Sequence, residues 1–196
     1  MSGIPVMHVP SEPEPTRDSF LARLHELWPA QPERIERALE LRRRLEPVPD
    51  SSPLRWDFGR DVDAVQAWRL SADLTTRGRS AEGLDLRVTG RDPSMTSPIL
   101  VFPPTGVRSV TIAMAFASDD GSDAIGQIYF MSTLEPSFSE ERSLTFPVSG
   151  DGRFVEHRLV VNAPPLGTDT ELVVVRFDPV DRCGALTLRS FSLDPS

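Results

Sequence analysis

Polar and aromatic residues recur at a two-residue spacing in two otherwise apolar segments of the chain. Gln127 and Tyr129 form one such pair, and Arg176 and Asp178 form the other. Since successive side chains of a β-strand point to opposite faces, each pair shares one face of its strand. A tyrosine ring can stack on the apolar side of a sugar ring, while amide and guanidinium groups can bond to its hydroxyls. We therefore predict a ligand-binding patch of Gln127, Tyr129 and Arg176, with Arg142 near by.

A structural role is the alternative interpretation of the same residues. Arg176 and Asp178 could pair with each other and brace the sheet, and Tyr129 could belong to the core. Trp56 and Trp68 are expected as core residues at strand edges, because large aromatic rings are mostly buried. The sequence leaves both interpretations of the patch open.

No motif for catalysis is present in the sequence. The Gly-x-Ser-x-Gly sequence that holds a nucleophilic serine is missing. All 21 basic residues are arginine, which excludes Schiff-base and phosphate-loop lysines. Glu140 and Glu141 are adjacent on an extended segment, whereas glycoside hydrolysis needs two carboxyl groups placed across a cleft. We expect a protein that is not an enzyme and needs no cofactor.

Metal-ligating residues do not cluster along the chain. His8, His25 and His157 fall in a tail, a helix and a strand, without the spacing of a metal site. The acidic segment 119–123 could ligate calcium, but it lacks the EF-hand spacing and lies where a hairpin turn is expected. We predict no metal site, and we expect His157, beside Glu156, on the protein surface.

Charge and composition exclude two further classes of partner. The net charge of −8 and the dispersed arginines argue against a nucleic-acid-binding protein, which needs a positive face. No apolar run approaches the length of a membrane span. The single cysteine, Cys183, is expected to be buried at a strand end, and no intramolecular disulfide is possible. With no secretory signal visible at residue 1, we expect a cytoplasmic protein.

Composition divides the chain into four segments. Residues 1–16 are rich in proline and acid and are predicted as a disordered tail. Residues 17–46 show helical spacing of apolar residues, broken by Pro29, and are predicted as two short amphipathic helices. Residues 47–53 form a proline-rich linker, and residues 54–196 a β-sandwich domain.

The sandwich prediction rests on alternation and on turn signals. About nine candidate strands are separated by Asp-Gly, Pro-Pro and Asp-Pro pairs, with no helical pattern between them. This organisation favours a mainly β protein, an antiparallel sandwich, over a parallel α/β sheet. The strands are predicted at 67–74, 84–89, 99–102, 107–117, 125–132, 143–148, 154–162, 170–178 and 185–193.

The predicted helical arm needs a surface to cover its apolar stripe. Helices this short are not stable alone in water. The arm could dock on its own sandwich, or on a second subunit or another protein. In the latter case the chain is a protein-interaction or oligomerisation module, with the sandwich as scaffold.

Six short signatures follow one another over about 130 residues, at 84–93, 126–130, 138–143, 152–156, 175–179 and 186–193. With them, the stretch from Trp68 onward resembles the galactose-binding-like jelly-roll modules found beside bacterial glycosyltransferases and other surface-polysaccharide enzymes. The resemblance implies an antiparallel jelly roll that binds carbohydrate without catalysing a reaction. Many relatives hold a structural calcium near the last strands, where this sequence has Arg189 and, beyond the strand, Asp194. We expect a non-catalytic carbohydrate-binding module linked to bacterial polysaccharide or glycan synthesis.

Overall fold

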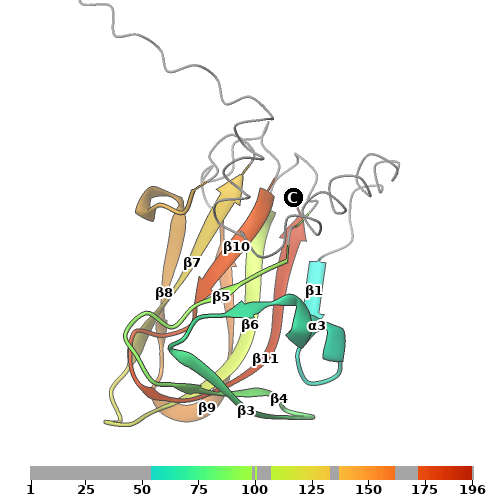
Figure 1. The fold of residues 1–196 in the computed structure, drawn as a ribbon. Helices are drawn as coiled ribbons and strands as arrows, with labels where there is room; N and C mark the ends of the chain where they lie inside the picture. Colours follow the sequence, from blue (N-terminus) through green and yellow to red (C-terminus); the bar gives the residue numbers. More distant parts are fainter. Residues whose placement is uncertain (1–53, 99, 101–106, 133–136, 162–171, 196) are drawn as a thin grey trace, which may run out of the picture.

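The protein is a sandwich of two antiparallel β-sheets in the computed structural model (Figure 1). The structure describes residues 54–98, 100, 107–132, 137–161 and 172–195. The predicted tail, helical arm and linker therefore lie outside the described residues, and their boundaries stay predictions. Among the residues described, no helix is long and apolar enough to cross a membrane.

Sheet A contains six strands, five of them in the order β3-β4-β11-β6-β9. The last strand, β11, is long enough to pair with β4 through its first half and with β1 through its second half. The strands of sheet A are β1 (Leu54–Asp57), β3 (Leu74–Ser80), β4 (Gly83–Val88), β6 (Val107–Ser118), β9 (Asp151–Val160) and β11 (Gly184–Pro195).

Sheet B contains five strands in the order β2-β5-β10-β7-β8. They are β2 (Arg69–Leu70), β5 (Met95–Thr96), β7 (Ala124–Ser132), β8 (Ser143–Val148) and β10 (Leu172–Asp178). From β8 onward the chain alternates between the sheets, with β9 in sheet A, β10 in sheet B and β11 in sheet A. This crossing from sheet to sheet brings segments distant in sequence side by side, as the jelly-roll prediction requires.

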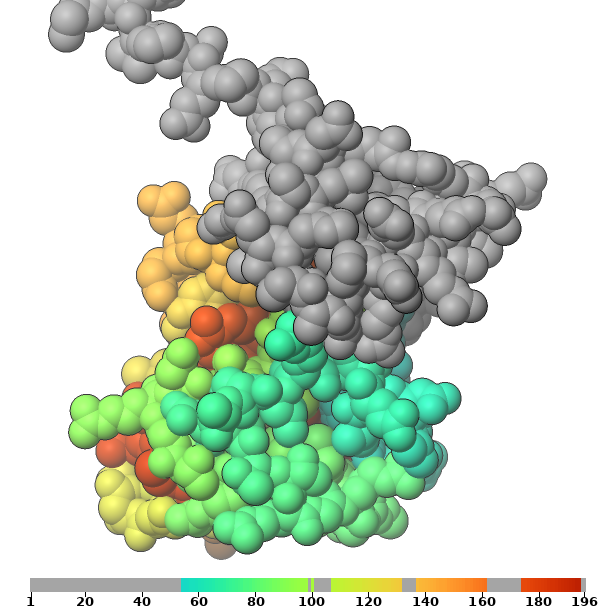
Figure 2. Space-filling view, viewed as in Figure 1, coloured from blue at the N-terminus to red at the C-terminus, as the bar shows by residue number. Residues whose placement is uncertain are grey.

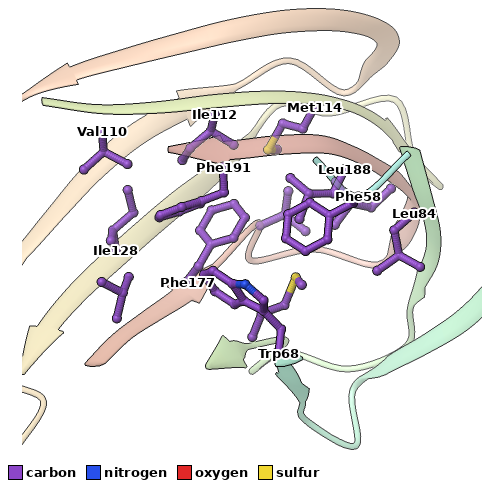
Figure 3. Packing of buried hydrophobic residues seen from close by; sticks show 14 of the residues in the cluster. Phe58, Trp68, Leu84, Val110, Ile112, Met114, Ile128, Phe177, Leu188 and Phe191 are labelled. Carbon is purple, nitrogen blue, oxygen red and sulfur yellow. The ribbon is translucent and has the colours of Figure 1, made fainter. Parts of the chain in front are cut away.

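Apolar side chains from the two sheets fill the space between them (Figure 3). Ile112 and Met114 of β6 face inward, as the alternation in the sequence predicts, and so do Ile128 of β7 and Phe177 of β10. All four are at most 1% exposed. The predicted alternation is therefore confirmed in both sheets, and it leaves the intervening polar side chains on the outer faces.

An aromatic cluster closes the core beside β1. Trp68 is 4% exposed, and its ring lies 5.2 Å from Phe191 and 5.3 Å from Trp56. Phe58 packs edge-on against the same indole. Both tryptophans belong to the core or pack against it, as predicted, so neither is a free stacking platform.

The early part of the domain differs from the prediction. Residues 67–74 were expected as one strand, but they hold the end of helix α3 (Val62–Ala67), the two-residue β2 and the start of β3. Asp61 caps α3 by accepting a hydrogen bond from the Asp63 amide. Residues 54–88 form much of the lower front surface of the sandwich (Figure 2). Of the strand predicted at 99–102, only residue 100 is described.

The acidic segment 119–123 forms a turn, but it joins β6 of sheet A to β7 of sheet B and is therefore not a hairpin. Its carboxylates are used within the protein. Asp119 accepts two hydrogen bonds from Arg87, at 2.8 and 2.5 Å, and Asp123 accepts one from the Gly150 amide. Bonds from Ser118 and the Ser122 amide lower the pKa of Asp120 to about 2. The turn interpretation is confirmed, and each of these three carboxylates accepts hydrogen bonds from the protein itself.

Candidate ligand-binding face

The register between β7 and β10 places the predicted patch on the outer face of sheet B. Arg176 lies opposite Tyr129, and Asp178 lies opposite Gln127. All four side chains are half-buried, while their sequence neighbours Ile128, Phe130, Val175 and Phe177 are fully buried on the inner face. We call the surface formed by Gln127, Tyr129, Arg176 and Asp178 the Tyr129 face.

Glu140 ties the β7 side of this face together. The Tyr129 hydroxyl donates to Glu140 Oε1 at 2.8 Å, and Gln127 Nε2 donates to Glu140 Oε2 at 2.6 Å. The Gln127 amide also donates to Ser143 Oγ at 2.8 Å. Glu140 stands in a short 3₁₀ turn, η1 (Glu140–Arg142), directly before β8. The loop thereby delivers a carboxylate over a strand that carries its two donors.

Arg176 ties the β10 side together. Its Nε and Nη2 donate to the two Asp178 oxygens at 2.8 and 2.9 Å, and Nη2 also lies 2.5 Å from Asp92 Oδ1. The same guanidinium lies 5.5 Å from the centroid of the Tyr129 ring, within the range of a cation–π interaction. The two halves of the face therefore meet where Arg176 covers Tyr129.

The ionisation of the face follows from these contacts. Burial, the Glu140 hydrogen bond and the nearby carboxylates raise the pKa of Tyr129 to about 12, so the phenol stays protonated. The hydrogen bonds from Tyr129 and Gln127 lower the pKa of Glu140, which keeps this group a carboxylate. Burial raises the pKa of Asp178, although Arg176 opposes that effect. The face thus presents fixed carboxylate acceptors beside a phenol and a guanidinium.

Several members of the Tyr129 network were not predicted. Gln127, Tyr129 and Arg176 were predicted from the sequence and are brought together by the structure, whereas no role there was predicted for Glu140 or Asp92. Both come from loops, whose position over the sheet has no periodic signal. Phe138 also approaches the face, with its ring centroid 6.4 Å from that of Tyr129 in a T-shaped arrangement. The fourth predicted residue, Arg142, is half-buried in η1, two residues after Glu140.

A hollow of about 410 Å³ lies at the end of the sandwich where the β6–β7 and β10–β11 turns meet. None of the predicted patch residues lines it. Cys183 lines this hollow and is exposed, so the prediction of a buried cysteine is wrong. The physical reason is its position in the turn before β11, outside the sheet that would cover it. The hollow is lined by Arg91, Asp119, Asp120, Asp181, Arg182 and Cys183.

The outer face of sheet A has a different construction. Arg189 sits at a register shift in β11, and its guanidinium lies 3.9 Å from the centroid of the Phe154 ring while it pairs with Glu82. Asp194 accepts hydrogen bonds from Ser109 and Thr111, at 2.9 and 3.3 Å. Neither Arg189 nor Asp194 belongs to a candidate metal cluster, and no group of three potential metal ligands occurs among the described residues.

His157 is not the surface residue that was expected. It points to the inner face of β9, where its ring centroid lies 4.8 Å from that of Phe146 of sheet B. This partial burial lowers the pKa of the imidazole. The sequence predicted a strand at 154–162, but the partial burial of this histidine depends on the approach of β8 of sheet B.

Comparisons with known proteins identify the fold of this chain. No protein-family model matches the sequence, and no curated protein matches it. Among solved structures, a carbohydrate-binding module described as specific for non-crystalline cellulose, CBM28, superimposes with a TM-score of 0.50 at 16% identity. That match covers 76% of this chain and 95% of the module.

Two other structures are similar at lower scores. The xylan-binding module CBM15 has a TM-score of 0.49 at 13% identity, over 75% of this chain and 98% of its own. The K1 cleaved adhesin domain of Lys-gingipain from Porphyromonas gingivalis has a TM-score of 0.49 at 12% identity, over 74% and 99%. At 16% identity the match to CBM28 shows a shared β-sandwich fold and does not transfer a ligand. This match and the two antiparallel sheets confirm the antiparallel β-sandwich predicted from the sequence.

Proposed function

We propose that this protein is a non-catalytic carbohydrate-binding module that holds a neutral saccharide on the Tyr129 face. The observation that carries the proposal is the convergence of a tyrosine, an amide, a guanidinium and carboxylates on one outer sheet face. These are the side chains that recognise a ring with an apolar side and several hydroxyls. The fold shared with the cellulose-specific CBM28 module supports the same class of ligand.

The charges of the network favour a neutral ligand. Three carboxylates (Asp92, Glu140 and Asp178) surround one guanidinium, that of Arg176. Carboxylates accept hydrogen bonds from hydroxyl groups, whereas they repel the carboxylates of uronic acids. Arg176 already bonds to two of the acids, so it is partly neutralised toward an incoming anion. A neutral hexose or pentose oligosaccharide therefore fits this face better than an acidic one.

Binding on this face should be weak. The polar groups already bond to one another, so a sugar gains only the difference between its own bonds and those that it replaces. We expect dissociation constants on the order of micromolar to millimolar.

From the resemblance noted in the sequence, we infer that the module works beside a bacterial glycosyltransferase or a related enzyme of surface-polysaccharide synthesis. Acting in the cytoplasm, in cis or in trans to such an enzyme, the module would hold the growing chain near it. The single cysteine fits this compartment. The second candidate is a protein-interaction module that acts through the predicted helical arm. The glycan-binding test below separates the two candidates.

The test is an array of neutral and acidic oligosaccharides, including bacterial glycans, followed by calorimetric titration of the hits. We expect neutral glycans to bind and acidic ones to fail. Tyr129→Ala and Arg176→Ala should each weaken binding at least about tenfold, because each removes a principal contact.

The matched control is Arg87→Ala. Arg87 also forms a two-bond pair with an aspartate, Asp119, but it lies on sheet A. This variant should therefore bind glycans like the wild type. If no glycan binds, carbohydrate recognition is wrong. If Arg87→Ala and Arg176→Ala weaken binding equally while both melt normally, the site does not lie on the Tyr129 face.

A further inference from the structure

Strand β9 is an edge strand of sheet A: among the described strands, only β6 pairs with it, along one of its two long sides. Most residues of β9 are exposed, including the apolar Phe154 and Val155, each 39% exposed, and Val160, 54% exposed. An open strand edge of this length, with apolar side chains on it, is a template for pairing with another strand.

The hydrogen-bonding groups on the open side can be assigned from the pairing with β6. The Val161 amide donates to the Arg108 carbonyl, so the odd-numbered residues of β9 direct their backbone groups toward β6. The even-numbered residues from 154 to 160 therefore direct their N–H and C=O groups away from the sheet. From Ser109 to Ala115 the β6–β9 register runs without a shift, so this row of groups is regular.

The other sheet edges are protected against such pairing. Strand β3 has a register shift at Arg77, and its exposed edge carries arginines. Strand β8 contains Pro147, which has no N–H to donate. Strands β2 and β1 are short, with two and four residues. Strand β9 has ten residues and no proline. It is the only long, regular edge among the described strands that lacks such a device.

The sequence of β9 is complementary to its own copy. A two-fold axis normal to a continuous antiparallel sheet sets one residue opposite its own copy. With His157 on that axis, Glu156 lies opposite Arg158 of the second copy, and Phe154 lies opposite Val160 of the second copy. Both pairings occur twice by symmetry and both lie on the outer face. All four residues are the even-numbered ones whose backbone groups face outward.

Neighbouring registers are less favourable. An axis at Glu156 sets two glutamates against each other, and an axis at Arg158 does the same for two arginines. An axis at Val155 sets Phe154 against Glu156. Within the described part of the chain, neither Glu156 nor Arg158 has an ion-pair partner. The register centred on His157 is the one that gives both of them a partner.

We propose that two copies of this chain associate through β9, with the axis at His157, and join their A sheets into one continuous sheet. Each copy presents to its partner copy four residues whose backbone groups point outward. Together these residues form eight backbone hydrogen bonds across the axis. On the inner side, Val155 lies opposite Leu159 of the second copy. This surface is distinct from the Tyr129 face and does not depend on what binds there.

The test is sedimentation equilibrium of the full chain and of charge-reversal variants. The wild type should dimerise. Glu156→Arg places two arginine pairs across the axis, and Arg158→Glu places two glutamate pairs, so each should raise the dimer dissociation constant by about tenfold or more. The double variant Glu156→Arg with Arg158→Glu restores opposite charges and should dimerise like the wild type.

The matched control is Arg77→Glu, which makes the same charge change as Arg158→Glu on the far edge of sheet A and should leave the dimer intact. A monomeric wild type overturns the proposal. A dimer that survives both single reversals overturns it as well, because association would then use another surface such as the predicted helical arm. Failure of a normally melting double variant to recover the dimer has the same consequence.

Discussion

The outer face of sheet B carries long polar side chains that reach across strands, whereas the centre of the outer face of sheet A is made of small residues. On β6, Ala113 and Ala115 alternate with buried apolar residues, and from β11 the Arg189 side chain reaches over to Phe154 of the edge strand β9. On β7 and β10 the corresponding positions hold Gln127, Tyr129 and Arg176. The same two-residue alternation produces both surfaces. They therefore differ in the length of their side chains and in the polar groups that the loops contribute.

That difference matters for recognition. Small side chains expose a flat sheet with few groups that a ligand could bond, while the long side chains of sheet B hold donors and acceptors above the backbone. In the absence of a ligand these donors and acceptors still need hydrogen-bond partners. Glu140 and Asp92 provide such partners from loops. The Tyr129 face is thus preorganised and already partly occupied by the protein itself.

The largest expected effect comes from a substitution in the core that supports both outer faces. Phe191 is fully buried between the sheets and packs against Trp68 and Phe177. Phe191→Ala should lower the free energy of unfolding by about 3–5 kcal/mol, because it deletes a buried ring and leaves a cavity. Urea denaturation followed by tryptophan fluorescence measures the loss. A loss of unfolding free energy below about 1 kcal/mol would mean that the two sheets do not depend on a shared core around Phe191.

The fold was predictable because its signal is periodic. Alternation along 107–117 and 125–132 identified β6 and β7 nearly to their ends, and the buried side chains follow directly. Even the register shift at Arg189 has a signal, since the apolar residues of β11 are spaced by two up to Leu188 and by three to Phe191. A strict two-residue pattern across 185–193 therefore overlooks the bulge.

The rest could not be predicted for physical reasons. Helix α3 has only six residues, too few for a helical period, and depends on its Asp61 cap. The partners of the Tyr129 face come from loops and from across the sheet, at sequence separations such as the 84 residues between Asp92 and Arg176. Single-strand patterns indicate which way a side chain points but not which loop lies above it.

On sheet B, the ionisation of Tyr129 can be measured directly. Tyr129 is the only tyrosine, so the phenolate absorbance of the protein reports this residue alone. The folded protein should titrate near pH 12, against an ordinary pKa of 10.0. Because the folded-state pKa is the raised one, the stability gained at Tyr129 is complete below pH 10 and is lost as the pH rises toward 12.

Glu140→Gln tests the cause of that shift. It removes the charge beside the hydroxyl, so the titration midpoint should fall toward 10 but not reach it, since burial is the largest cause. Glu141→Gln is the matched control and should leave the midpoint unchanged. A wild-type midpoint at 10 in the folded protein would show that Tyr129 is neither buried nor bonded to Glu140 in solution.

The smallest expected effect concerns the Arg189 clamp on sheet A. Arg189 stacks on Phe154 and pairs with Glu82, but its side chain is 42% exposed, so both interactions are weakened by water and salt. Arg189→Ala should lower the free energy of unfolding by about 0.5–1 kcal/mol. Glu82→Gln removes only the ion pair, so a smaller loss for Glu82→Gln than for Arg189→Ala assigns the remainder to the stacking.

In both variants the Tyr129 titration should be unchanged, because the clamp and the Tyr129 face lie on opposite sides of the sandwich. A shifted titration would mean that the two outer faces are coupled through the core, and the contrast between them would then be one of composition only.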